Sequence, residues 1–425
     1  MPEPLNPKTT HFEFSGPVGT FVISTGLPVL IIALYFACNA NGCPANGAAV
    51  WQQIWSTRWL SREALGAYLT WLLGLMVLDV IVPGATVPGT TLRTGKKLQY
   101  KFNGTRIILL LAITLAYRAW ATAWELPELQ FIYNHFLEIA NSTLVVAFVL
   151  STYLYIASFG TDSEGQPKLC ALGGNSGNAM YDWFIGRELN PRIGSLDLKL
   201  FLEMRPGLLL WILIDLAMAH HQYLKFGQVS WSIVLVTVFQ AYYVIEGTFY
   251  EKGLVSMIDT TTDGLGFMLV FGDISLVPFT YCLQTRFLAD HPIALSWLAI
   301  AAIVAVYVGG ILVFRLSNNE KNGFKAGDPK YAHLKYLETP TGSKLLVTGW
   351  WGTARHINYF GDWISAWACC LPCGLHLIPY YYMAYFAALL IHRNERDEAK
   401  CSAKYGATWD EYKRQVPYKF IPYLY

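Results

Sequence analysis

Polar and ionisable side chains gather in one otherwise hydrophobic stretch, residues 349–374 (GWWGTARHINYFGDWISAWACCLPCG). Five of them fall within eight residues: Arg355, His356, Asn358, Tyr359 and Asp362. The apolar flanks place the stretch in or beside a membrane, where an ionisable group is costly unless it meets a partner or a ligand. Catalysis or cofactor binding is therefore our first interpretation of this stretch.

The same stretch ends in a CCxxC pattern formed by Cys369, Cys370 and Cys373. Such a pattern can bind zinc, but no second Cys/His pair follows at the required spacing, and the neighbouring residues are apolar. We therefore expect buried thiols and no metal site.

A second group of reactive side chains lies in residues 240–259 (QAYYVIEGTFYEKGLVSMID). Tyr243 and Glu246 are three residues apart, so they share one face of a helix. An apolar setting would raise the pKa of a carboxyl group and keep it protonated, which suits a proton donor. An aromatic belt with a capping Glu explains the same residues equally well.

Two cytoplasmic segments carry further candidates. Lys321 and Lys325 follow a hydrophobic span and could hold a phosphate, although basic residues are common at such positions for topological reasons alone. In the tail, two pairs are spaced by four residues and so share helix faces: Arg393 with Asp397, and Cys401 with Tyr405. Aromatic rings that could stack on a purine or a nicotinamide come from Trp409, Tyr412 and Tyr418. An amphipathic surface helix is the alternative for this tail.

The composition predicts the scaffold that must position these residues. The chain of 425 residues is 54% hydrophobic and only 14% charged, against roughly 25% charged in soluble domains. We expect an all-α polytopic bundle of roughly ten spans. The expected spans lie near 17–37, 64–82, 106–123, 131–156, 206–221, 229–249, 266–285, 292–314, 345–368 and 371–391. The ninth contains the polar stretch and is expected to be broken or re-entrant.

Basic residues are distributed unevenly over the expected loops. With a cytoplasmic N-terminus, 25 of the 31 Lys and Arg residues fall on the cytoplasmic side and four on the other. This asymmetry places both termini in the cytoplasm. We expect one integral membrane domain over 1–425. Residues 1–205 would form N-terminal spans and a folded cytoplasmic cap at 157–205, and residues 206–425 would form the pockets.

Other polar groups within expected spans are interpreted as structural pairs. Arg118, for example, could pair with Asp79 on a neighbouring helix. The chain contains neither GxGxxG nor GxxxxGK[ST], so no Rossmann domain or P-loop is expected, and a nucleotide would need a pocket made from spans and tail. Nothing indicates nucleic-acid binding or a required protein partner.

Long motifs in the chain resemble those of the membrane sterol reductase family, which includes delta-14, delta-7 and delta-24(28) members and the reductase half of the lamin B receptor. Two signatures carry the resemblance: GNAMYDWFIGRELNPRIGSLDLKLFLEMRPG at 177–207 and LLVTGWWGTARHINYFGDWISAWACCLPCG at 345–374. The match runs from about residue 16 to the end of the chain, and it is most similar to the delta-14 members.

This resemblance implies NADPH-dependent reduction of a ring double bond in a sterol taken from the bilayer, in a bacterial inner membrane or the endoplasmic reticulum. It assigns phosphate contacts to Lys321 and Lys325, the second replacing the family's usual Arg. It also implies the following cofactor contacts: Leu346, Trp351, Asn358 and Tyr359 at the nicotinamide, and Arg393, Asp397, Cys401, Tyr405 and Tyr412 at the adenosine. Arg355 and His356 would form the pocket wall or supply protons.

An unactivated alkene must be protonated before it can accept a hydride. The candidate donors are Tyr243 and Glu246, followed by His356; Glu246 stands where many family members have Asp. Two alternatives remain open at this point. The tail also resembles isoprenylcysteine methyltransferases that use S-adenosylmethionine, and a sterol-binding membrane protein without turnover is the other.

Overall fold

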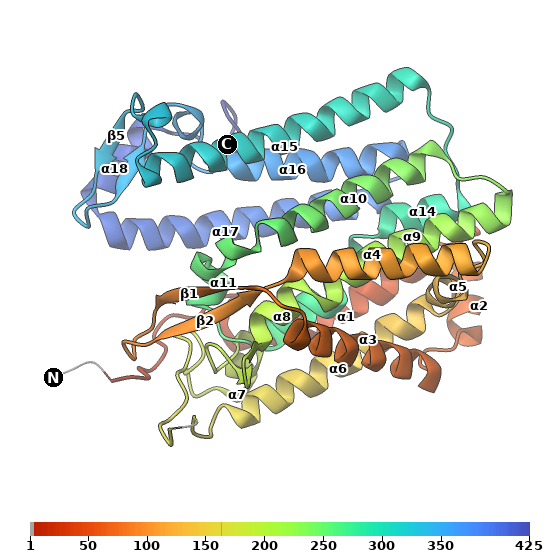
Figure 1. Cartoon of the computed structure of the whole chain (residues 1–425), viewed down its shortest axis with the longest axis horizontal. Helices are drawn as coiled ribbons and strands as arrows, with labels where there is room; N and C mark the ends of the chain where they lie inside the picture. Colours follow the sequence, from red (N-terminus) through yellow and green to blue (C-terminus); the bar gives the residue numbers. More distant parts are fainter. Residues whose placement is uncertain (1–3, 163) are drawn as a thin grey trace. The chain divides into compact units, whose positions relative to one another are not determined.

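The computed structural model describes residues 4–162 and 164–425 (Figure 1). Within this part of the chain, seven helical segments are long and apolar enough to cross a membrane. They are Gly16–Ala37, Arg62–Ile81, Gly104–Ala121, Phe136–Ala157, Trp231–Phe249, Phe267–Asp290 and Trp297–Ala326. The other three predicted spans also contain helices: Pro206–Phe226, Ile357–Cys370 and Tyr381–Tyr405. The prediction of a helical polytopic membrane protein is confirmed.

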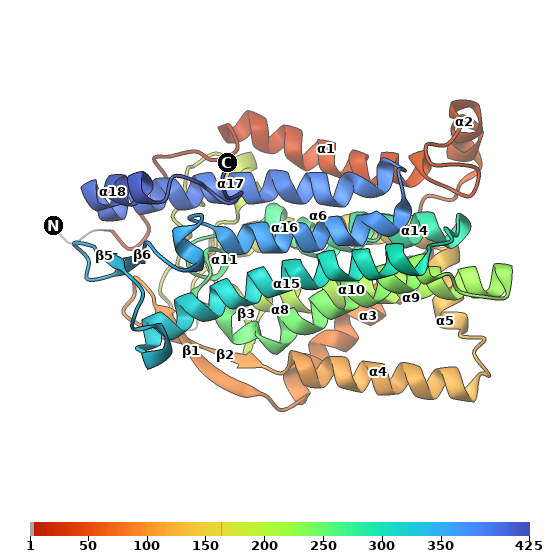
Figure 2. The same cartoon turned by 90° about the horizontal axis from the view of Figure 1, so that it is seen from above.

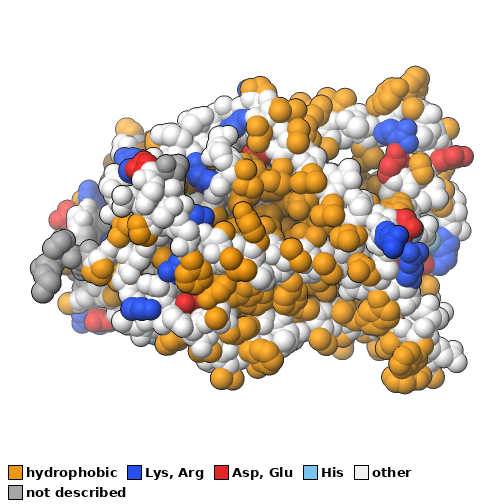
Figure 3. Space-filling model, turned by 90° about the horizontal axis from the view of Figure 1, so that it is seen from below, with side chains coloured by type: hydrophobic (Ala, Val, Ile, Leu, Met, Phe, Trp, Pro, Cys, Tyr) orange, Lys and Arg blue, Asp and Glu red, His pale blue; other side chains and the backbone are white. Residues whose placement is uncertain are grey.

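The chain forms two compact units. The N-terminal unit comprises Met1–Val229 and Gln240–His291, and the C-terminal unit comprises Ser230–Phe239 and Pro292–Tyr425. Space-filling representation shows one face of the molecule on which apolar side chains cover the middle, whereas charged side chains gather towards the ends (Figure 3). This separation is what a hydrocarbon layer demands of the surface it touches.

The N-terminal unit begins with α1 (Gly16–Ala37), α2 (Gly47–Ser56) and α3 (Arg62–Ile81). A hairpin of β1 (Ala85–Thr91) and β2 (Lys97–Phe102) follows, then α4 (Gly104–Ala121), α5 (Pro127–Asn134) and α6 (Phe136–Ala157). A Cys38–Cys43 disulfide closes the turn after α1; the sequence offered no signal for it. Trp51 and Trp55 are exposed on α2, as expected of a helix lying at a membrane interface.

The segment predicted at 157–205, as far as the structure describes it, contains α7 (Ala179–Ile185), a small hairpin of β3 (Arg192–Ile193) and β4 (Leu196–Asp197), and α8 (Leu198–Met204). Its cytoplasmic location stays a prediction. Lys199 is 1% exposed and donates a hydrogen bond of 2.6 Å from Nζ to the Asp263 carbonyl. Burial lowers the pKa of Lys199 to about 8, so this segment is a packed part of the protein and not a mobile loop.

The N-terminal unit continues with α9 (Pro206–Phe226) and the second half of α10 (Trp231–Phe249). A broken helical segment completes it: η1 (Glu251–Ser256), α11 (Ile258–Thr261), α12 (Phe267–Phe271), the π-helical turn η2 (Gly272–Leu276), α13 (Val277–Thr280) and α14 (Leu283–Asp290). Gly207 explains how α9 approaches this turn, because a Cβ there would lie 1.7 Å from the Asp273 carbonyl oxygen.

The C-terminal unit is organised around α15 (Trp297–Ala326), α16 (Ile357–Cys370) and α17 (Tyr381–Tyr405), which lie side by side (Figure 2). Gly310 and Gly361 allow α15 and α16 to touch, since a Cβ on Gly361 would lie 2.5 Å from the Phe314 backbone nitrogen. Small residues permit such close approach in membrane proteins. Short elements connect and follow these helices: η3 (Pro329–Tyr331), β5 (Tyr336–Glu338), β6 (Lys344–Leu346), η4 (Trp350–Gly352), η5 (Leu371–Cys373), η6 (Ile378–Tyr380) and α18 (Ala407–Gln415).

Candidate functional site

The polar stretch spans a turn and the helix that follows it. The chain forms a hairpin with β5 and β6, then the single turn η4, and α16 begins only at Ile357. Gly349 has φ +69°, and a Cβ there would come within 2.6 Å of both Glu320 carboxylate oxygens. Glu320 Oε1 accepts a hydrogen bond of 2.8 Å from the Trp350 amide. The expected break in the ninth span is therefore present, and the turn is fastened to α15.

Lys321 and Trp351 meet at this turn. The Lys321 Nζ atom lies 3.9 Å from the centre of the Trp351 ring. Trp351 is itself buried, and its Nε1 donates a 2.7 Å hydrogen bond to the Ser317 carbonyl. Lys321 is an exposed residue, and its ammonium is held over this buried aromatic face, which places a cation at the turn.

Arg355 fastens the stretch to α17 and to the C-terminal tail. Its Nη1 donates hydrogen bonds of 2.8 Å to the carbonyls of Val416 and Pro417. Its Nε donates a 3.0 Å hydrogen bond to Glu398, with which the guanidinium also forms an ion pair. Its backbone nitrogen donates to the Tyr418 carbonyl. The side chain is almost fully buried, and these contacts tie the turn before α16 to α17 and to the tail.

His356 and Asn358 each present a buried polar atom without a hydrogen-bond partner, Nε2 and Oδ1 respectively. The His356 ring stacks on Tyr359, with ring centres 4.8 Å apart. Burial, followed by the charges of Lys321, Arg355 and Arg393, lowers the pKa of His356 to about 3. His356 is therefore a neutral imidazole at physiological pH, and an imidazolium proton donor is not present in the ligand-free protein.

Asn394 was missed by the sequence analysis. It lies on α17, is fully buried, and both atoms of its amide lack hydrogen-bond partners. Leaving such an amide unpaired costs about 1–3 kcal/mol per group, so the unsatisfied atoms at the start of α16 and on α17 need an explanation. An Asn between Arg393 and Glu395 in a charged helix gave no sequence signal. A ligand with an amide, hydroxyl and phosphate groups would meet the donors and acceptors present here.

The other predicted cofactor residues fall into two groups. Tyr359 donates a 2.8 Å hydrogen bond to Asp397 Oδ2, and Lys325 is exposed at the end of α15; Arg393 acts electrostatically on His356 and Tyr359. By contrast, four residues belong to hydrophobic clusters: Leu346 packs with Trp351, and Cys401, Tyr405 and Tyr412 pack around Trp409. Burial raises the pKa of Tyr412. All of these assignments remain predictions.

Tyr243 and Glu246 belong to the N-terminal unit, on α10. Both are half-buried, and the Tyr243 ring centre lies 6.2 Å from that of Trp211. Trp211 is fixed by a 2.9 Å hydrogen bond from its Nε1 to Gln240. Trp211 therefore places an aromatic ring beside Tyr243.

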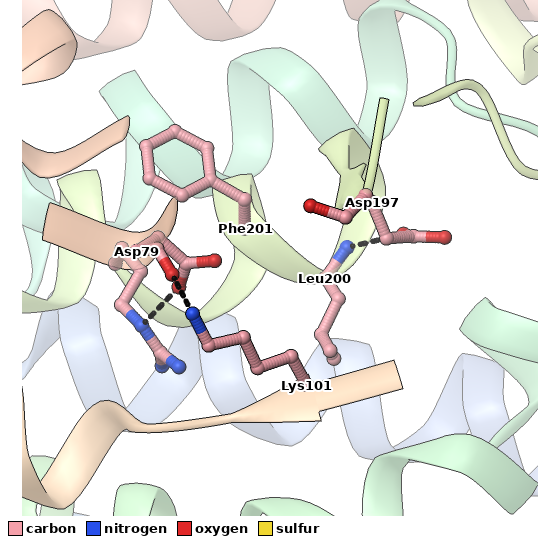
Figure 4. A pocket seen from close by; sticks show the side chains of 7 residues that line it. Asp79, Lys101, Asp197, Leu200 and Phe201 are labelled. Carbon is pink, nitrogen blue, oxygen red and sulfur yellow. Dashed lines mark hydrogen bonds and ion pairs between the residues drawn. The ribbon is translucent and has the colours of Figure 1, made fainter. Parts of the chain in front are cut away.

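A buried charge cluster in the N-terminal unit has a different character. Arg205, 2% exposed, pairs with Asp79 at 3.2 Å and with Glu251 at 2.8 Å. Lys101 points at Asp79 and donates a 2.9 Å hydrogen bond to its carbonyl (Figure 4). The adjoining cavity of about 10 Å³ holds no more than about one water. This cluster is structural.

The predicted Arg118–Asp79 pair is wrong. Arg118 pairs instead with Glu128 on α5, and Asp79 takes Arg205. Arg118 lies in the last turn of α4, whereas the Asp79 carbonyl accepts a hydrogen bond from Asn103, the residue just before α4 begins. The two side chains therefore lie at opposite ends of α4.

The prediction of buried thiols is confirmed: Cys369, Cys370 and Cys373 are all buried. Among the described residues, no group of three or more His, Cys, Asp or Glu side chains could hold a metal ion.

These features define a helical polytopic membrane protein with buried polar side chains around its last three helices. Comparison with known proteins gives the family: residues 8–425 match the model of the ergosterol biosynthesis ERG4/ERG24 family, and the chain belongs to it. It is 46% identical to Delta(14)-sterol reductase ERG24 of Saccharomyces cerevisiae, over 100% of both chains. It is also 44% identical to the Candida albicans enzyme of that name, over 99% of each chain, and 43% identical to that of Schizosaccharomyces pombe, over 98% of this chain and 97% of the other. The resemblance to the sterol reductases is confirmed, and the methyltransferase alternative loses its support.

Proposed function

We propose that this protein is an NADPH-dependent delta-14 sterol reductase of the endoplasmic reticulum membrane. The family match and full-length relatives of that name support the reaction, which is an enzymatic reduction of a carbon–carbon double bond. One structural observation carries the placement of the cofactor: the unsatisfied buried atoms of His356, Asn358 and Asn394 beside the Lys321–Trp351 pair. Reduction of this kind uses a reduced nicotinamide cofactor; its identity as NADPH is part of the proposal.

Different residues of the C-terminal unit would bind different parts of the cofactor. Lys321 and Lys325 offer point charges for phosphate groups, and Arg393 adds a third cation. The amides of Asn358 and Asn394 and the neutral His356 ring offer hydrogen bonds to a carboxamide or a ribose. When bound, NADPH supplies the hydride. Arg355 keeps this wall in place by holding the tail.

The protein must also protonate the alkene and protect the resulting carbocation from water. The donor must be an acid that is protonated at physiological pH. Tyr243 and Glu246 remain the first candidates, because they share one face of an apolar helix on which Tyr243 lies beside Trp211. His356 ranks third, because its imidazole is neutral and is a weak acid in that form. Trp211 beside Tyr243 offers a π-face to a carbocation.

The test is turnover by the purified full-length chain in lipid nanodiscs, supplied with NADPH and separately with delta-14, delta-7 and delta-24(28) sterols. Products are identified by mass spectrometry and NADPH consumption by absorbance. We expect loss of the delta-14 double bond with one NADPH consumed per product. Sterol and NADPH binding without NADPH oxidation would instead favour the non-catalytic alternative.

The proton donor is tested in the same assay with Tyr243→Phe and Glu246→Gln. Each removes an acidic proton and retains the shape of the side chain. We expect kcat to fall by about 10²- to 10⁴-fold for the true donor, while NADPH affinity is unchanged. Full turnover by both variants would remove both residues from the list.

A further inference from the structure

A buried glutamine side chain joins three helices of the N-terminal unit. Gln240 lies on α10 and is 1% exposed. Its Oε1 accepts a 2.9 Å hydrogen bond from Trp211 Nε1 on α9. Its Nε2 donates hydrogen bonds of 2.9 Å to the Tyr281 carbonyl and of 3.1 Å to Gln284 Oε1. One amide group thus ties α9 and α10 to the segment that continues as α14.

We propose that Gln240 is a positioning residue for the reduction. It fixes the Trp211 indole, and the indole in turn fixes the orientation of the Tyr243 phenol. This inference rests on the proposed function, in which Tyr243 is a candidate proton donor. Gln240 acts through Trp211 and does not itself touch the substrate.

The first argument is that the Gln240 amide has a single orientation. The indole N–H of Trp211 is a donor only, and the Tyr281 carbonyl is an acceptor only. The first contact must therefore be made by Oε1 of the amide and the second by Nε2. Tyr281 lies in the break between α13 and α14. Gln240 therefore couples the indole to the point at which this helical segment is interrupted.

The second argument is the packing of the indole. Trp211 is 1% exposed, and its ring contacts two tyrosine rings. The Tyr281 ring meets it edge-on, with ring centres 5.4 Å apart and ring planes at 78°. The Tyr243 ring centre lies 6.2 Å away, with the planes at 55°. Both distances are in the range at which aromatic rings interact. Because Tyr243 is only half-buried, a rotation of the indole would change the surface on which the phenol rests.

The third argument is the spacing on α10. Gln240 and Tyr243 are three residues apart, so they lie on one face of the helix. The face that carries the phenol is therefore held to both neighbouring helices about one turn away. A misplacement of about 1 Å in a reacting group lowers a rate by about 10²-fold. A side chain that fixes this face therefore contributes to the rate without contacting the substrate.

The chain offers a matched control on α9. Gln222 is fully buried, and its Nε2 donates a 2.6 Å hydrogen bond to the Leu288 carbonyl, which is also on α14. It lies eleven residues beyond Trp211, about 16 Å along the helix axis. Gln240→Met and Gln222→Met both keep the length of the side chain and remove a buried amide. Both should lower the melting temperature, because each leaves a carbonyl without this donor.

The experiment is turnover of the delta-14 sterol by the full-length protein in nanodiscs, with rates expressed per folded molecule. We expect kcat of Gln240→Met to be about 10- to 100-fold below that of Gln222→Met, with equal NADPH affinity in the two variants. A double-mutant cycle with Tyr243→Phe is the second measurement. In that background Gln240→Met should have little further effect on kcat, because the group that it positions is absent.

Two results would overturn the inference while the wild type is active. Equal kcat in Gln240→Met and Gln222→Met would show that both glutamines have only a structural role. A full further fall in kcat on adding Gln240→Met to Tyr243→Phe would show that Gln240 does not act through the phenol. An inactive wild type is a different failure, because it would refute the proposed function and with it any role of Gln240 in that reaction.

Discussion

Two clusters of buried polar side chains in this protein differ in whether their donor and acceptor atoms have hydrogen-bond partners. In the N-terminal unit, Arg205 is surrounded by Asp79, Glu251 and Asn103, and its donors are occupied. In the C-terminal unit, buried atoms of His356, Asn358 and Asn394 have no partner. A satisfied buried network rigidifies a fold, whereas an unsatisfied one is retained only if something else completes it. We therefore interpret the first cluster as part of the scaffold, and our proposal is that a ligand completes the second.

The largest effect is expected from Arg205→Ala. It leaves Asp79 and Glu251 buried without a cation, which should lower the free energy of unfolding by about 3–5 kcal/mol. Thermal unfolding in detergent measures this. Arg58→Ala is the matched control, because the Arg58–Glu63 pair is exposed on both sides and should give no measurable change. Equal stability of the Arg205→Ala variant would show that the cluster is not part of the scaffold.

The next effect concerns the charged edge of the C-terminal site. Lys321→Ala should weaken NADPH binding by about 10- to 100-fold, the value of a lost charge-assisted hydrogen bond. Because Lys321 is exposed, the melting temperature should change little. Titration of NADPH measures the affinity, and Lys330→Ala provides a control with an exposed lysine from the same unit. Equal losses in both variants would mean that Lys321 contributes only to the general positive charge.

The pH dependence of stability tests the buried histidine. The pKa of His356 is lowered from 6.5 to about 3 in the folded protein, so the unfolded chain is protonated first as the pH falls. The contribution of the neutral His356 ring to the free energy of unfolding is complete above pH 6.5 and is lost progressively as the pH falls towards 3. Between pH 7.5 and pH 5, the wild type should therefore lose about 1–2 kcal/mol more stability than His356→Gln. Parallel stability profiles would show that His356 is not buried as a neutral group.

The smallest effect is expected from a change at Asn394, and it distinguishes a scaffold role from a ligand-binding role most clearly. Asn394→Leu replaces an unpaired amide with an apolar group of similar size, so the ligand-free protein should be as stable as the wild type or more so. NADPH affinity should fall by roughly three- to tenfold. Thermal unfolding with and without NADPH measures both quantities. Destabilisation of the ligand-free variant would place Asn394 in the scaffold.

Hydropathy predicted most of the helices because long apolar segments have few alternatives in a bilayer. It was less informative where helices are interrupted. The segment Phe267–Asp290 contains a π-helical turn next to Gly207, a tertiary contact that no local pattern reveals. The ion-pair partners of buried or membrane-embedded charges were also not predictable. Arg118 pairs with Glu128 and Arg205 pairs with Asp79 because of the tertiary fold, and no local pattern distinguishes the two arginines.

The candidate site was predictable in its location and not in its details. Polar residues between apolar flanks marked residues 349–374, but the roles within it depend on contacts from distant segments. Arg355 is held by the tail at Val416 and Pro417. Asn394 differs from the other polar residues of its helix only in that its amide is buried. Spacing along one helix shows which residues share a face; it does not show which face is enclosed.

The contact between Gly310 and Gly361 has a consequence for how this sequence can vary. At these two positions, even a methyl group would collide with the backbone or side chain of the adjacent helix, so the restriction arises from geometry and applies to every other amino acid. A single alanine at either glycine would push the two helices apart and carry the polar stretch with them.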